Sequence, residues 1–137
     1  MKEKLKNYFE CKEEKDIFLK IAEWSKEKMS VEICGFIGFS NENYTLKLCK
    51  NIAEDPKKYF AIDPLDFLTF KEENKIAYVF HSHVSGDEEP SEFDILMSEN
   101  CCIPFMIYSL NTEMFKVYLP KNDDSSEEVV NKILQHI

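Results

Sequence analysis

Two histidines, a serine and an aspartate lie within fourteen residues, in a spacing that suits a catalytic metal site. They are His81 and His83, then Ser91 after seven intervening residues, then Asp94. The segment that ends in the histidines has the pattern of a strand, and residues two apart on a strand point to the same face, so both imidazoles can reach one ion. Two histidines and one carboxylate leave the fourth position of a tetrahedral zinc ion for water. The pattern therefore predicts hydrolytic zinc chemistry.

Ser91 and Asp94 also fit a purely structural role, as the capping box of a helix. They lie three apart at the start of a predicted helix, with Pro90 just before it. As the N-cap, Ser91 would accept a hydrogen bond from the Asp94 amide while the Asp94 carboxylate reaches back. Capping does not exclude metal binding. The histidines favour the metal, because the chain has only three and the third, His136, lies in the C-terminal tail.

Glu32 is a candidate for the carboxylate that hydrolysis requires. Zinc lowers the pKa of its bound water and polarises a carbonyl, so a nearby carboxylate need only accept and return the proton. Glu32 lies just ahead of an apolar run that begins at Cys34, where an acid without a partner would be costly to bury. The alternative is a glutamate at a surface strand end that points into solvent. The motifs of zincins and of zinc deaminases are absent from the sequence.

Together these residues resemble the JAMM family of metalloproteases, also called MPN-plus or JAB. Its signature is a distant glutamate followed by His-x-His-x(7)-Ser-x-x-Asp, and every signature position is matched here. The resemblance runs over roughly Lys20 to Pro120 and implies the JAMM/MPN fold, which is similar to that of cytidine deaminases.

The resemblance also implies a role for each signature residue. His81, His83 and Asp94 would bind one zinc ion per chain. Glu32 would be the general base that acts on the water bound to zinc. Ser91 would help to orient that water and to stabilise the oxyanion.

A second segment, Tyr59 to Pro64, resembles the stretch that borders the substrate groove in small bacterial and phage members of the family. On this resemblance Tyr59, Phe60 and Ile62 would contact substrate. An edge strand explains the same residues equally well.

The resemblance implies a zinc peptidase or isopeptidase that cuts at the C-terminus of a ubiquitin-like or sulfur-carrier protein. Its partner would then be a protein with an extended C-terminal tail. Two alternatives stay open: a phage tail-tip assembly domain that acts on cell-wall or tail proteins, and a non-catalytic MPN scaffold. MPN domains often pair, so a homodimer is one of the expected assemblies.

Length, composition and charge limit the number of domains and the classes of partner. The 137 residues, 44% of them hydrophobic, suit a single domain over residues 1–137. A formal net charge of −9 argues against nucleic acid and anionic membranes as partners. There is no apolar stretch of ~20 residues to span a bilayer and no apolar signal core, which predicts a cytoplasmic protein. The five cysteines include no Cys-x-x-Cys and are expected to be reduced.

The periodicity of apolar residues predicts a mixed α/β fold, with a central sheet flanked by helices. Helices are expected over 13–29 and 64–73, from Ser91, and in the tail from Ser125. Strands are expected over 35–39, 44–53, 75–83, 105–110 and 114–119, with residues 40–43 as the turn of a hairpin.

Overall fold

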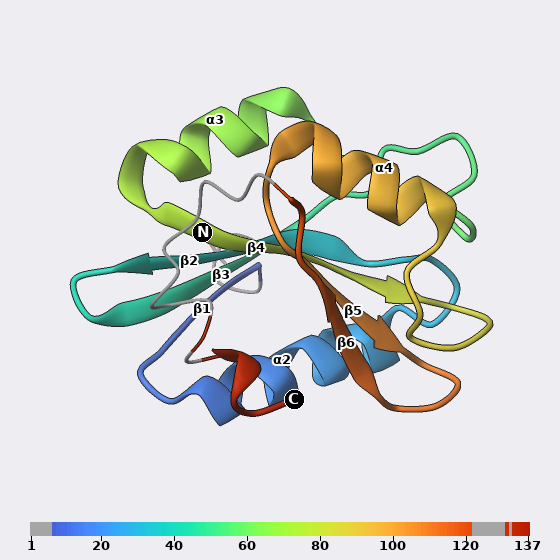
Figure 1. The fold of residues 1–137 in the computed structure, drawn as a ribbon, viewed down its shortest axis with the longest axis horizontal. Coiled ribbons are helices and arrows are strands. Elements are labelled where there is room, and N and C mark those ends of the chain that lie inside the picture. Colours follow the sequence, from blue (N-terminus) through green and yellow to red (C-terminus); the bar gives the residue numbers. More distant parts are fainter. Residues whose placement is uncertain (1–6, 122–130, 132) are drawn as a thin grey trace.

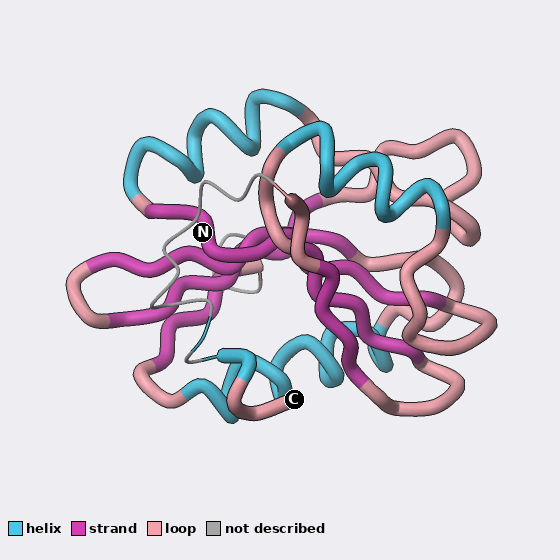
Figure 2. Tube along the Cα trace, viewed as in Figure 1, coloured by secondary structure: helices cyan, strands magenta, loops and turns pink. Residues whose placement is uncertain are grey.

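The computed structural model of the protein describes residues 7–121, 131 and 133–137. In this part of the chain, three helices pack on a six-stranded mixed sheet (Figures 1 and 2). The strands are β1 (Tyr8–Cys11), β2 (Cys34–Ser40), β3 (Asn43–Cys49), β4 (Lys75–His83), β5 (Phe105–Ser109) and β6 (Phe115–Tyr118). The helices are α2 (Glu14–Glu27), α3 (Pro64–Glu73) and α4 (Glu92–Cys101).

The sheet has the strand order β1-β3-β2-β4-β5-β6. Strands β4 and β5 run parallel and are joined by α4, as a parallel pair requires a crossover, whereas the other neighbours are antiparallel. Strand β4 is a central strand with neighbours on both sides, and it is buried from Ile76 to Ser82. The backbone that carries the histidines is therefore held by ladders on both edges.

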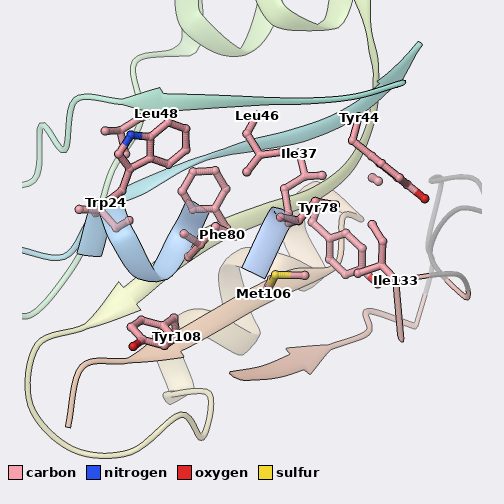
Figure 3. Close-up of a cluster of buried hydrophobic side chains, with 14 residues drawn as sticks. Trp24, Ile37, Tyr44, Leu46, Leu48, Tyr78, Phe80, Met106, Tyr108 and Ile133 are labelled. Atoms are coloured by element: carbon pink, nitrogen blue, oxygen red, sulfur yellow. The ribbon is translucent and has the colours of Figure 1, made fainter. Parts of the chain in front are cut away.

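The two faces of the sheet are covered by different helices. Helix α2 covers one face, and α3 and α4 cover the other (Figure 1). Ile17, Ile21 and Trp24 recur at helical spacing on α2 and are buried in the larger of two core clusters. Figure 3 shows this cluster, in which the Trp24 ring stacks on Phe80 with centroids 6.0 Å apart. The second cluster lies under α3 and includes Phe36, Phe70 and Phe105, together with Phe60, whose ring stacks on His81.

Most of the predicted elements are confirmed, including the mixed α/β fold, the strand that carries the histidines and the β2–β3 hairpin. Asn41 and Glu42 at the hairpin turn have φ of 51° and 66°, the backbone that tight two-residue turns require. One strand was missed, the short β1 at the sheet edge beside β3. The predicted tail helix from Ser125 begins outside the described residues.

The predicted strand over 44–53 is too long, because β3 ends at Cys49. The edge-strand interpretation of Tyr59 to Pro64 is wrong, since residues 50–63 form neither strand nor helix. The side chain of Asn51 bonds to backbone groups of this segment that a ladder would otherwise use. No helix among the described residues is long and apolar enough to cross a membrane.

Candidate metal centre

The cluster predicted from the sequence forms at the end of β4. His81, His83 and Asp94 each offer one ligand atom, and these atoms lie within 4.8 Å of one another. His81 is fully buried, and the side chain of His83 is 12% exposed. The two histidines are therefore brought together by strand geometry, and Asp94 reaches them from the first turn of α4.

The Asp94 carboxylate takes part in a capping box at the start of α4. The Ser91 hydroxyl accepts a hydrogen bond from the Asp94 amide at 3.1 Å, and Asp94 Oδ2 accepts one from the Ser91 amide at 3.0 Å. Asp94 Oδ1 lies 3.0 Å from His81 Nε2, and Oδ2 lies 3.0 Å from His83 Nε2. The capping box is thus confirmed, and the same carboxylate lies against both imidazoles.

The His83 ring is oriented by a hydrogen bond at Nδ1, the ring nitrogen that does not face Asp94. Its Nδ1 donates a hydrogen bond to the Asp87 carbonyl at 2.8 Å, which leaves Nε2 as the atom that can bind a metal. A backbone carbonyl in a loop has no side-chain signature, so the sequence provides no signal for this contact.

His81 shows that a metal ion fits this site. Nε2 of His81 lies close to Asp94 Oδ1, but the geometry of this contact is not that of a hydrogen bond. In the described part of the chain, neither ring nitrogen of His81 has a hydrogen-bond partner. A buried polar atom without a partner costs free energy. A metal bound through one nitrogen would supply the missing interaction, and two imidazoles with one carboxylate are a donor set that zinc accepts.

The His81 ring packs against two aromatic rings, which also contact each other. The Phe60 ring stacks on it with centroids 4.4 Å apart, and the Phe105 ring meets it edge-on at 5.6 Å. This packing fixes the direction in which the imidazole nitrogens point.

The electrostatics of the cluster keep Asp94 ionised. Burial would raise the pKa of Asp94, but contacts from His81, His83 and the Ser91 amide outweigh it and hold the pKa well below its usual range. Burial lowers the pKa of His81, which favours the neutral imidazole that a metal needs. Burial also opposes a charge on His83, yet its contacts with Asp94 and Asp87 raise its pKa.

Glu32 lies beside this cluster, two residues before β2 begins. It is only 5% exposed, so the alternative of a solvent-facing strand end is wrong. Burial raises its pKa to about 8, while His83 lowers it and the charge of Asp94 raises it. The buried carboxyl thus experiences the charges of two of the predicted ligands.

The remaining predicted site residues differ in exposure. Ser91 is exposed at the N-terminus of α4, and its predicted part in catalysis stays a prediction. Tyr59 is 47% exposed and meets the Phe93 ring at 5.3 Å. Phe60 is buried against His81, and Ile62 packs partly buried on the second core cluster. Of the three predicted substrate contacts, Tyr59 presents the most side chain to solvent.

The raised pKa of Glu32 predicts a pH dependence in metal-free protein. The folded state holds the proton more tightly than the unfolded state, whose pKa is near 4.5. The contribution of Glu32 to stability is therefore full below pH 4.5 and is lost as the pH rises through about 8. From pH 5 to pH 8.5, the free energy of unfolding of the wild type should fall by about 2–4 kcal/mol relative to that of Glu32→Gln. This range is the energy of the full pKa shift, reduced because the carboxyl is partly accessible to solvent. Urea unfolding of both proteins in the presence of a metal chelator measures the difference. An unfolding free energy that changes equally with pH in the two proteins would contradict the prediction.

Comparisons with known proteins agree with this fold and with the predicted family. The solution structure of protein DSY2949 from Desulfitobacterium hafniense is similar to this chain, with a TM-score of 0.64 and 21% sequence identity. The likeness covers 82% of this chain and 87% of that one. No curated protein matches the sequence. The family model of prokaryotic homologs of the JAB domain matches residues 14–120, which include all the predicted ligands and Glu32. The chain therefore belongs to the prokaryotic homologs of the JAB domain.

Proposed function

We propose that the protein is a zinc-dependent peptidase or isopeptidase that hydrolyses a bond at the C-terminus of a ubiquitin-like or sulfur-carrier protein. The observation that carries this proposal is the complete set of His81, His83 and Asp94 with a buried carboxylate, Glu32, beside it. Family membership adds support, because JAB domains include metalloproteases, although some members are not catalytic.

Zinc held by His81, His83 and Asp94 would lower the pKa of a water molecule and polarise the scissile carbonyl. A dication held nearby would lower the pKa of Glu32 from about 8 and so favour its ionised carboxylate. Glu32 then accepts the proton of the attacking water and returns it to the leaving amine. The Ser91 hydroxyl, at the N-terminus of α4, donates to the oxyanion that develops.

The burial of the site supports an extended tail as the substrate. His81 is fully buried and the side chain of Asp94 is 4% exposed, so a folded protein surface would not reach the ligands. A narrow chain of small residues would approach through His83, whose side chain is 12% exposed, and the exposed Tyr59 lies against Phe93 of α4. The net charge of −9 favours a protein partner over nucleic acid. The five cysteines, all free, fit a reducing compartment such as the cytoplasm.

The experiment is cleavage of a reporter fused behind the small-residue C-terminal tail of a ubiquitin-like protein. We expect zinc-loaded protein to release the reporter at the end of the tail, and to cleave the tail peptide alone poorly, because the folded partner supplies binding contacts. Mass spectrometry of the products locates the cut. Cleavage of cell-wall peptides but of no fusion would favour the phage alternative, and tight binding without any cleavage would favour the scaffold.

A further inference from the structure

Glu32 and Ile33 precede strand β2, yet all four of their backbone polar groups are hydrogen-bonded. The Glu32 amide donates to Pro56 O at 2.7 Å, and the Ile33 amide donates to Ser82 Oγ at 2.9 Å. Ser82 N–H donates to Ile33 O at 3.0 Å, and the Glu32 carbonyl accepts from Asn51 Nδ2 at 2.9 Å. Among the described residues no hydrogen bond holds the Glu32 carboxylate itself. Its position is therefore set through the backbone.

Asn51 is the side chain that joins this dipeptide to the loop over residues 51–61. Its Nδ2 donates to the carbonyls of Glu32 and Tyr59, both at 2.9 Å, with a longer contact of 3.3 Å to a third carbonyl. Its Oδ1 accepts from the amides of Ala53 at 3.0 Å and Ala61 at 3.1 Å. Since Nδ2 faces only carbonyls and Oδ1 only amides, the orientation of the side-chain amide is fixed.

We propose that Asn51 is a positioning residue for Glu32. The hydrogen bonds of its side chain all run to backbone groups and none to a metal ligand, so it acts on the proton transfer through the backbone of Glu32. By bonding to both residues that flank Phe60, it also holds the segment whose ring stacks on His81. One side chain thus ties the base to the loop that packs on a metal ligand. This inference rests on the proposed function, in which Glu32 is the general base.

Two variants separate the contacts of Asn51. Asn51→Ala removes all of them. Asn51→Asp keeps an oxygen for the Ala53 and Ala61 amides, but it replaces the donor to Glu32 O by a second oxygen that repels the carbonyls. Both should lower the single-turnover rate by about tenfold to a hundredfold, the cost of a small misplacement of a catalytic group, with KM changed less than kcat and zinc content unchanged. Asn74→Ala, at the end of α3 and away from the site, is the matched control and should leave the rate unaltered.

A double-mutant cycle with Glu32→Gln distinguishes positioning from general structural damage. If Asn51 acts through Glu32, then Asn51→Asp should cost the Glu32→Gln protein less than about twofold, because the group it positions no longer takes a proton. An equal loss in both backgrounds would overturn the inference. A Glu32→Gln protein with full activity would instead show that the proposed role of Glu32 is wrong.

Hydrogen exchange provides a measurement that needs no substrate. The Glu32 amide donates to Pro56 O, and the Ile52 amide donates to Ala61 O. In Asn51→Asp these two amides should exchange at least tenfold faster than in the wild type, while the amides of β4 keep their protection. Unchanged protection at Glu32 would overturn the positioning role whether or not any fusion is cleaved. Faster exchange throughout β4 would show that the fold as a whole is loosened and would equally overturn it.

Discussion

Glu32→Gln should lower the single-turnover rate of reporter release by about 10²–10⁴-fold, the usual contribution of a general base. Glutamine keeps the size of the side chain and a hydrogen-bonding group, but it cannot take the proton from water. Substrate affinity and zinc content should be preserved, because Glu32 is not one of the three clustered ligands. Zinc content, substrate binding and single-turnover rate are measured on one preparation.

Glu72→Gln is the matched control for this variant, since Glu72 lies exposed on α3. It should change stability by no more than about 0.5 kcal/mol and leave the rate unaltered. Full activity with full zinc in Glu32→Gln would remove Glu32 from the mechanism. Loss of zinc in that variant would make it a ligand or a support for the ligands.

The residues of the candidate metal centre could be predicted because their spacing is tied to regular elements. Two histidines two apart on a strand share a face, and an aspartate three after an N-cap serine lies in the first helical turn. His81, His83 and Asp94 meet for these two local reasons once α4 joins the parallel strands β4 and β5. The burial of Glu32 was not predicted, because an acid without a partner is costly to bury and the sequence also fits a glutamate at a strand end that points into solvent.

The contacts that hold these residues were not predictable in the same way. Asn51 sits in a segment without regular structure, and its bonds run to backbone groups up to 19 residues away, for which no periodicity exists. The resemblance predicted that Phe60 contacts substrate, and it gave no sign that the Phe60 ring stacks on His81. Strand β1 is four residues long and lies at an edge, where pairing with β3 rather than local propensity decides its structure.

Wild-type protein should bind one zinc ion per chain, and the variant with both His81→Ala and His83→Ala should bind none and lose all hydrolysis. In the described part of the chain, His81, His83 and Asp94 form the only cluster of this kind. Removal of the metal should leave the protein folded, because the two hydrophobic clusters hold the sheet and helices without it. Elemental analysis measures the zinc, and circular dichroism with urea unfolding follows the fold. Zinc that stays in the double variant would refute the site.

Substitutions at Asp94 and Ser91 separate the proposed metal binding from helix capping, since the Asp94 carboxylate would take part in both. Asp94→Asn keeps an oxygen that can accept from the Ser91 amide but loses the charge and one ligand oxygen, so zinc should be lost while α4 stays capped. Ser91→Ala makes the opposite change: it removes the acceptor for the Asp94 amide and should cost about 0.5–2 kcal/mol of stability with zinc retained. If Ser91→Ala lost zinc as fully as Asp94→Asn, the capping box would be required to aim the carboxylate. If neither variant lost zinc, Asp94 would not be a ligand.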